Sequence, residues 1–297
     1  MRYNLIMNQI SNQWKDYEVI DTGNKEKLER WNHTILRRPD PVCIWPIEDE
    51  REWNKADAIY HRSKSGGGQW EYKKPLKEFW TIGYKDLRFK ISPTGFKHTG
   101  LFPEQAANWD FMSEKIRQSS LEEIRILNLF AYTVGATMAC SKAGASEVVH
   151  VDASKGMVQW AKENMVLSSL QDHKIRFIVE DCLKFVKREQ RRGRKYHGIV
   201  MDPPSYGRGP NGELWKLEDQ LFDLIQNCMQ ILDPDALFFI VNCYTTGFSC
   251  STLEQTLKHS IQKEFNGKIE VGENLLPVSS SSNDVLPCGI FGRWTKE

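Results

Sequence analysis

The sequence has no Cys-x-x-Cys pair, although it contains 7 cysteines in 297 residues. An odd cysteine count without that spacing argues against a disulfide framework and against a zinc knuckle. We therefore expect reduced thiols and no bound metal. The cysteines are Cys43, Cys140, Cys182, Cys228, Cys243, Cys250 and Cys288.

Long apolar runs and an excess of one charge are also missing. The longest apolar run, "ALFFIV" at 236–241, has the length of a buried strand and not of a membrane span. The start, "MRYNLIMNQISNQW", lacks the uninterrupted apolar stretch of a signal peptide. Because 40 Lys and Arg oppose 39 Asp and Glu, a polyanionic partner would need a local basic patch. We expect a cytoplasmic protein with no membrane contact, either a monomer or a homodimer.

Short apolar runs alternate with longer amphipathic ones from Leu121 onward, which is typical of a parallel sheet wound with helices. The pattern predicts a Rossmann-like, doubly wound α/β domain over residues 116–297. Its expected strands lie near 125–130, 147–151, 175–179, 198–201 and 237–243, and its expected helices near 137–142, 155–167, 183–191, 214–232 and 252–264. Two further β-like runs, in "KIEVGENLLPVSSSSNDVLPCGIFGRW", have no helix between them and should form a C-terminal antiparallel hairpin.

Residues 1–115 have a different pattern, in which aromatic and charged residues mix in short β-like pieces such as "EFWTIGYKDLRFKIS". We expect a small β-rich N-terminal domain there, which would recognise the substrate. Most of the 10 tryptophans fall in this part of the chain. They either supply the core that a small domain needs or stack on unpaired bases.

Several of the expected parallel strands end in small or acidic residues. Ligands of open α/β sheets bind beyond the carboxyl ends of the strands. The first strand runs into "LNLFAYTVGAT", a small-residue turn that lacks the G-x-G-x-x-G of nicotinamide-binding folds. Asp152 ends the second strand, where an acid can hold two ribose hydroxyls, and Asp181 follows the third, where it can accept from an adenine amino group. Each aspartate also precedes a helix, so each alone could equally be an N-cap.

The fourth strand ends in "KYHGIVMDPPSYGRG". Pro203 and Pro204 lack the N–H that a strand ladder requires, so the chain must leave the sheet there. Their carbonyls and the Asp202 carboxylate form a rigid group of acceptors, and Tyr206 adds an aromatic face. The alternative is a tight turn with no further role.

These stretches together resemble the class I S-adenosylmethionine-dependent methyltransferases, in the branch of the 23S ribosomal RNA enzymes that form 5-methylcytosine and 7-methylguanine. The resemblance rests on "ILNLFAYTVGATMACSKAGASEVVHVDASKGMVQWAKEN", "VEDCLKFVKREQRRG" and "DPPSYGRG", and on "KHTGLFPEQAANWDF" at 97–111, which is similar to that branch's Thr-Gly-x-x-x-x-Gln loop. It covers residues 90–297. It implies S-adenosylmethionine as cofactor, S-adenosylhomocysteine as product, and a base of RNA, ribosomal RNA above all, as acceptor.

The resemblance also implies roles for individual residues. Asp152 would take the ribose, Asp181 the adenine, and Asp202 with Pro203 would face the methyl acceptor. Further residues would line the methionine side and the front of the pocket: Asn128, Phe130, Tyr132 and Gly135 for the former, Phe102 and Gln105 for the latter. The family pattern has Tyr-Thr-Gly where this chain has Tyr132-Thr133-Val134, so the path of this loop stays open. Ser205 before Tyr206 matches the ribosomal RNA branch better than the enzymes that methylate amino groups.

Two basic stretches follow the third and fourth strands. "KFVKREQRRGRK" at 184–195 carries its basic end away from the cofactor edge, so we expect a solvated face or a contact with distant RNA backbone. "GRGPNGELWK" at 207–216 lies beside the acceptor group, and its Arg208 and Lys216 suit a phosphate contact or a lid.

The sequence leaves the acceptor atom open. A ring nitrogen or an exocyclic amine needs only orientation by Asp202 and the Pro203 carbonyl. Cytosine carbon 5 needs a thiolate that first adds to carbon 6, and the candidate is Cys243 at the end of the fifth strand, with Cys182 a weaker one. The alternative for Cys243 is a small buried residue. Two other functions stay open: methylation of a small molecule or protein, and a non-catalytic RNA-binding module, the latter suggested by Val134.

Overall fold

The computed structural model describes residues 7–63, 67–95, 97–208, 212, 214–245, 247–281 and 283–296. Its contacts divide the chain into two compact units. The α/β unit comprises Met1–Gln9, Ala107–Asn274 and Gly289–Glu297, and the β-rich unit comprises Ile10–Ala106 and Leu275–Cys288. We expected a single cut at residue 115. In the structure the first long segment of the β-rich unit ends at Ala106, and a second segment, Leu275–Cys288, contains the end of one C-terminal strand and the start of the next.

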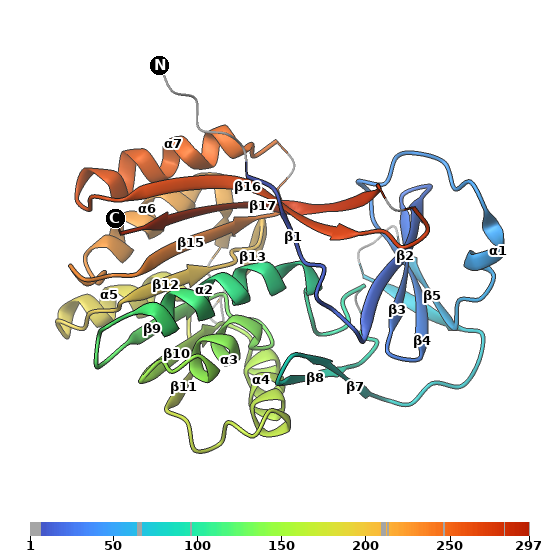
Figure 1. Cartoon of the computed structure of the whole chain (residues 1–297), viewed down its shortest axis with the longest axis horizontal. Coiled ribbons are helices and arrows are strands. Elements are labelled where there is room, and N and C mark those ends of the chain that lie inside the picture. Colours follow the sequence, from blue (N-terminus) through green and yellow to red (C-terminus); the bar gives the residue numbers. More distant parts are fainter. Residues whose placement is uncertain are drawn as a thin grey trace. The chain divides into compact units, whose positions relative to one another are not determined.

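The centre of the α/β unit is an eight-stranded sheet in the order β1-β16-β17-β15-β12-β9-β10-β11 (Figure 1). The strands β15, β12, β9, β10 and β11 are mutually parallel, whereas β17 runs antiparallel to β15. Their bounds are β1 Gln9–Ile10, β9 Arg125–Leu129, β10 Glu147–Asp152, β11 Ile175–Val179, β12 Gly198–Met201, β15 Phe238–Cys243, β16 Lys268–Pro277 and β17 Val285–Thr295. The five expected parallel strands are thus confirmed, and the two C-terminal runs are neighbours in the sheet.

The strand order reverses between β9 and β12, since the chain builds outward through β10 and β11 and then crosses to the other side of β9. Such a switch point is where open α/β sheets bind ligands. The strands end level with one another there: Leu129 pairs with both Val151 and Met201, and Met201 also pairs with Val241. The residues that follow these four therefore meet at one edge.

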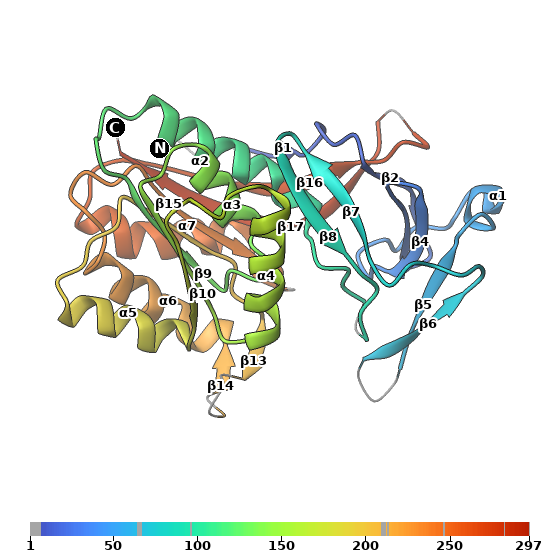
Figure 2. The same ribbon diagram turned by 90° about the horizontal axis from the view of Figure 1, so that it is seen from below.

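Helices cover both faces of this sheet (Figure 2). One face carries α2 (Ala106–Gln118), α3 (Gly135–Lys142) and α4 (Lys155–Leu167); the other carries α5 (Cys182–Arg191), α6 (Leu217–Met229) and α7 (Cys250–Ser260), followed by a 3-10 turn at Ile261–Lys263. Alternate strand residues point to opposite faces. Leu127, Leu129 and Met201 accordingly join the core with α5, α6 and α7. No helix among the described residues is long and apolar enough to cross a membrane.

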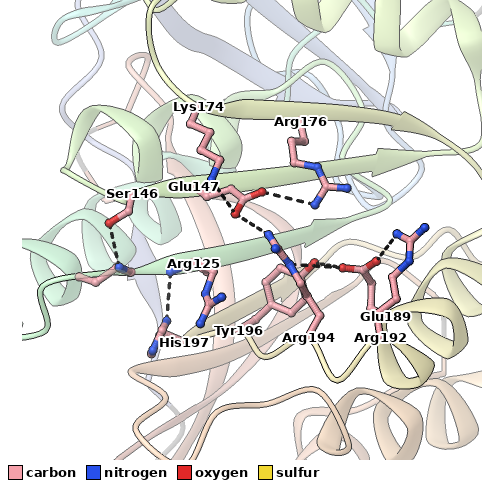
Figure 3. Close-up of polar contacts among 11 residues, drawn as sticks. Arg125, Ser146, Glu147, Lys174, Arg176, Glu189, Arg192, Arg194, Tyr196 and His197 are labelled. Atoms are coloured by element: carbon pink, nitrogen blue, oxygen red, sulfur yellow. Dashed lines mark hydrogen bonds and ion pairs between the residues drawn. The ribbon is translucent and has the colours of Figure 1, made fainter.

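Ion pairs close the amino-terminal edge of the sheet (Figure 3). The side chain of Glu147, at the start of β10, is 3% exposed, and three cations surround it: Lys174, Arg176 and Arg194. Glu189 in α5 accepts a hydrogen bond of 2.7 Å from the Tyr196 hydroxyl and pairs with Arg192 at 3.0 Å. The basic end of the 184–195 run therefore has a structural use, because Arg192 and Arg194 hold buried carboxylates.

The β-rich unit contains a five-stranded sheet in the order β2-β3-β4-β5-β6 and a separate pair, β7-β8. The bounds are β2 Tyr17–Gly23, β3 Glu26–Trp31, β4 Thr34–Pro39, β5 Ala58–Arg62, β6 Gly68–Tyr72, β7 Trp80–Tyr84 and β8 Leu87–Ile91, with α1 at Glu50–Trp53 and a 3-10 turn at Pro103–Gln105. Trp31 and Trp53 are buried in it, whereas Trp45 is 38% exposed. The core interpretation of the tryptophans thus holds for the first two.

Candidate active site

The loop after β9 has a strained backbone. Phe130, Tyr132 and Val134 have φ angles of 53°, 51° and 97°. Such angles are uncommon for residues with side chains, above all for a β-branched valine, and cost of order 1–3 kcal/mol each. A loop of this kind persists only where its surroundings hold it.

Hydrogen bonds from three other elements hold this loop. The Phe130 amide donates to Cys182 Sγ at the start of α5 (3.3 Å), and the Tyr132 amide donates to Asp152 Oδ2 at the end of β10 (2.9 Å). The buried Asn164 of α4 donates through Nδ2 to the Thr133 carbonyl at 2.9 Å. The loop is therefore preformed beyond the strand ends, with its backbone path fixed by side chains distant in sequence.

The glycine next to this loop serves packing and not a positive φ. Val134, at the place of the family's glycine, has the positive φ angle, while Gly135 begins the regular helix α3. A Cβ at position 135 would lie 2.3 Å from Cζ2 of Trp109 in α2. The loop thus keeps its left-handed turn at Val134, and Gly135 lets the Trp109 ring approach the first turn of α3.

Asp152 accepts backbone hydrogen bonds with both of its carboxylate oxygens. Its Oδ2 accepts from the Tyr132 amide at 2.9 Å and its Oδ1 from the Ser154 amide at 2.8 Å. Burial raises the pKa of this carboxyl, and the two amide donors oppose that shift. A carboxylate has about four lone-pair sites, so each oxygen can accept one further hydrogen bond. Asp152 can therefore receive two adjacent hydroxyls while it orders the loop.

Asn128 makes contacts that the sequence did not indicate, and Asp181 caps a helix, which the sequence had left as an alternative. Asn128 is buried and donates to Thr137 Oγ1 at 3.0 Å, and that hydroxyl lies 3.0 Å from His150 Nδ1. Asp181 is the N-cap of α5, with Oδ1 accepting from the Lys184 amide at 2.9 Å. Capping uses Oδ1, so Oδ2 can still accept the expected hydrogen bond from an adenine amino group. The roles of both toward a cofactor stay predictions.

The Asp-Pro-Pro segment lies at the same edge, directly after β12. Pro203 is buried, whereas Pro204 is exposed and its carbonyl accepts from Trp215 Nε1 at 2.6 Å. The Trp215 ring packs on Phe130 of the loop after β9, with the ring centroids 4.9 Å apart. One tryptophan thus connects the expected acceptor segment with the expected cofactor loop. Asp202 Oδ1 is buried, and Oδ2 lies 3.4 Å from the Tyr244 hydroxyl.

Tyr206 begins a short antiparallel hairpin next to this segment, formed by β13 (Tyr206–Arg208) and β14 (Leu214–Lys216). Its side chain is 56% exposed. Arg208 and Lys216 are exposed on the two strands of the hairpin, which agrees with their expected place beside the acceptor group. Residues 209–211 and 213 of the expected lid lie outside the described residues.

Cys243 has the environment of a core residue. Its side chain ends β15 and is 1% exposed. Burial, with a smaller contribution from the Asp202 charge, raises the pKa of this thiol to about 12. Cys182 is buried too, and its sulfur accepts from the Phe130 amide. Neither thiol has the electropositive, partly exposed surroundings that favour a reactive thiolate.

Phe102 and Gln105 belong to the β-rich unit. Phe102 precedes the 3-10 turn and its ring centroid lies 5.3 Å from that of His98, while Gln105 is buried. Their contact with the cofactor stays a prediction. No cluster of three or more His, Cys, Asp or Glu suited to a metal occurs in the described part of the chain.

Sequence reasoning missed three residues that shape this edge: Asn164, Cys182 as a loop acceptor, and Trp215. Asn164 is a polar residue in the middle of an amphipathic helix, and only its burial distinguishes it from a solvent-facing one. Trp215 stood inside an expected helix at 214–232, whereas Leu214–Lys216 is a strand. The local sequence offered no signal for the contact of Asn164 with Thr133 or for that of Trp215 with Phe130, because these partners belong to other elements of the chain.

Comparisons with known proteins agree with this fold. A family model described as S-adenosylmethionine-dependent methyltransferase matches residues 33–274. A solved structure of a SAM-dependent methyltransferase from Agrobacterium tumefaciens is 34% identical, has a TM-score of 0.93, and is matched over 100% of this chain and 95% of that one.

Curated relatives named "Ribosomal RNA large subunit methyltransferase K/L" match part of the chain. The protein from Shewanella frigidimarina is 30% identical over 156 residues, covering 52% of this chain and 21% of the relative. The one from Colwellia psychrerythraea is 30% identical over 178 residues, covering 60% and 24%. The chain therefore spans less than a quarter of the length of these relatives. On the family match, the Agrobacterium structure and the strand-end site, this chain belongs to the S-adenosylmethionine-dependent methyltransferases.

Proposed function

We propose that this chain transfers a methyl group from S-adenosylmethionine to a base of RNA, with ribosomal RNA as the leading substrate. The observation that supports this proposal is the position of Asp202 and Pro203: they directly follow β12, whose end is level with the end of β9, and they offer hydrogen-bond acceptors to a base there. The names of the curated relatives support RNA as the substrate. Because those relatives are far longer than this chain, their substrate is a proposal here. A ribosomal RNA substrate would also be consistent with the expected cytoplasmic location.

The residues at the strand ends fit the methyl donor of the family. Asp152 presents two carboxylate oxygens, each already fixed by one backbone amide, and suits the paired hydroxyls of a ribose. Asp181 would accept from the adenine amino group, and the loop at 130–134 with Gly135 would hold the methionine part. When bound, S-adenosylmethionine supplies an electrophilic methyl group on a sulfonium.

Asp202 and Pro203 would orient the acceptor. A planar base that carries an N–H group can donate to the Asp202 carboxylate or to the Pro203 carbonyl, and this fixes the direction of its nucleophilic nitrogen. Holding two reactants in line is worth about 7–11 kcal/mol of an activation barrier. Methyl transfer to a nitrogen that these two residues orient needs no covalent intermediate.

The state of Cys243 favours a nitrogen acceptor over cytosine carbon 5. The Cys243 side chain is 1% exposed and burial raises the pKa of its thiol to about 12, so the neutral thiol predominates at neutral pH. A thiolate that must add to carbon 6 would therefore be almost absent in the free enzyme. We accordingly place methylation on a ring nitrogen or an exocyclic amine.

Incubation with labelled S-adenosylmethionine tests the proposal. Ribosomes, naked ribosomal RNA, a protein extract and a metabolite extract serve as separate acceptors, and mass spectrometry maps the modified atom. We expect label on a nitrogen of an RNA base, lost in Asp202→Ala and retained in Cys243→Ser. Label confined to protein or metabolites would overturn the RNA substrate. Label on cytosine carbon 5 that Cys243→Ser abolishes would overturn the nitrogen acceptor.

A further inference from the structure

Tyr244 lies at the acceptor side of the site and received no role above. It directly follows β15, and its hydroxyl is 3.4 Å from Asp202 Oδ2. Its side chain is 38% exposed although it sits beside a carboxylate whose Oδ1 is buried. An aromatic ring that is half open to solvent next to the acceptor-orienting acid is positioned to contact a planar acceptor.

A glycine on the neighbouring strand makes room for this ring. Gly289 in β17 has a φ of +112°, and a Cβ there would lie 2.7 Å from Tyr244 Cδ1 and 2.9 Å from the Cys243 carbonyl oxygen. Cys243 pairs with Ile290, so Gly289 is next to the end of β15 in the ladder. The position of the Tyr244 ring therefore depends on the absence of a side chain at residue 289.

The loops that carry Tyr244 and Asp202 are also joined directly. Thr245 Oγ1 donates to Ser205 Oγ at 2.7 Å, so the residue after Tyr244 bonds to the residue after Pro204. Two contacts thus connect the end of β15 with the Asp-Pro-Pro segment, one through the hydroxyl of Tyr244 and one through Thr245. The Tyr244 ring and the Asp202 carboxylate therefore lie next to each other at the Asp-Pro-Pro segment.

We propose that Tyr244 is an acceptor-binding residue for methyl transfer: its ring forms one wall of the site for the acceptor base, and its hydroxyl helps to orient the Asp202 carboxylate. This inference rests on the proposed function, since the stacking partner is a nucleobase. Stacking of a base on an aromatic side chain tolerates any base, because every base has a π-face. Discrimination would then come from the hydrogen bonds to Asp202, and binding strength from the ring.

Two substitutions separate the ring from the hydroxyl. Tyr244→Leu removes the ring, and we expect the KM for RNA to rise roughly 5- to 150-fold, which is the range that the loss of one base stack of about 1–3 kcal/mol corresponds to. Tyr244→Phe keeps the ring, so we expect a nearly unchanged KM and a kcat lowered about 3- to 10-fold, as for the loss of one ordinary hydrogen bond. The control is Phe222→Leu, at an aromatic of α6 that is 48% exposed.

Gly289→Ala provides an independent test, because it would displace the Tyr244 ring without altering it. We expect this variant to raise the KM for RNA in the wild-type background and to add little in the Tyr244→Leu background. Affinity for S-adenosylhomocysteine, measured by calorimetry, should stay within threefold of wild type in the Tyr244 variants and in Phe222→Leu.

The outcomes distinguish this inference from the proposed function. A wild-type chain that labels no RNA overturns both. A wild-type chain that labels RNA, together with a Tyr244→Leu variant of equal KM and kcat, overturns the inference alone. Loss of S-adenosylhomocysteine binding and of melting temperature in Tyr244→Phe would also overturn it, because Tyr244 would then be a residue of the fold.

Discussion

Substitution of Asp152 by asparagine should weaken cofactor binding strongly, because both carboxylate oxygens are already in use. Oδ2 accepts from the Tyr132 amide at 2.9 Å and Oδ1 from the Ser154 amide at 2.8 Å. The asparagine NH₂ group would have to face one of these amides, so one hydrogen bond is lost and two donors oppose each other. The loss also removes the negative charge that strengthens the bonds to ribose hydroxyls.

The magnitude follows from these contacts. Losing a hydrogen bond to a charged group costs about 1.5–3 kcal/mol, and an unsatisfied donor adds about 1 kcal/mol or more. A total of about 2.5–4 kcal/mol, taken entirely from binding, corresponds to a dissociation constant raised roughly 60- to 700-fold. Part of this cost would appear in the positive-φ loop at Tyr132, which loses one of its anchors.

Calorimetric titration with S-adenosylhomocysteine measures this effect. Asp235→Asn is the matched control, since it makes the same chemical change at an exposed aspartate whose side chain pairs with Lys296. We expect the control to bind like wild type. An Asp152→Asn variant that keeps its melting temperature and binds within threefold of wild type would refute the assignment of Asp152 to the ribose.

Three further changes test other parts of the structure. Gly135→Ala should destabilise the chain by about 1–3 kcal/mol in chemical denaturation, because its Cβ would lie 2.3 Å from the Trp109 ring; an unchanged midpoint would contradict this packing. Burial raises the pKa of Glu104 to about 7 in the folded chain, so the free energy of unfolding should fall by up to about 3 kcal/mol as the pH rises from 4.5 through 7. In unfolding midpoints measured from pH 5 to 8, Glu104→Gln should remove this decline, and equal pH profiles of wild type and variant would contradict the raised pKa. Arg194→Met should lower the free energy of unfolding by about 1–3 kcal/mol, because the buried Glu147 carboxylate then keeps its ion pairs with Lys174 and Arg176 but loses the one with Arg194. The affinity for S-adenosylhomocysteine should stay unchanged, and a loss of affinity would contradict a purely structural role of Arg194.

The parallel sheet and its strand-end acids could be predicted from the sequence because both depend on local patterns. Short apolar runs separated by amphipathic ones define β9 to β12 and β15, and parallel strands place their carboxyl ends together. Asp152 and Asp202 could therefore be assigned to one edge. The paired ends of β9, β10 and β12 confirm this placement.

Contacts between distant segments could not be predicted in this way. Val134 rather than Gly135 takes the left-handed conformation, because Asp152 and Asn164 hold the loop from other elements. Residues 214–216 were expected to begin a helix, but they pair with Tyr206–Arg208 and leave α6 to begin at Leu217. The helix α2 at Ala106–Gln118 was not predicted, because most of this stretch was assigned to the β-rich N-terminal domain.

In the proposed reaction Asp202, directly after β12, orients an RNA base for methyl transfer. The most direct test is single-turnover methyl transfer to ribosomal RNA by wild type and Asp202→Asn, at S-adenosylmethionine concentrations that saturate both. We expect a methylation rate at least about 100-fold lower in Asp202→Asn, with S-adenosylhomocysteine affinity unchanged, as for the loss of a positioned catalytic group. Equal rates of RNA methylation by the two proteins would contradict the account.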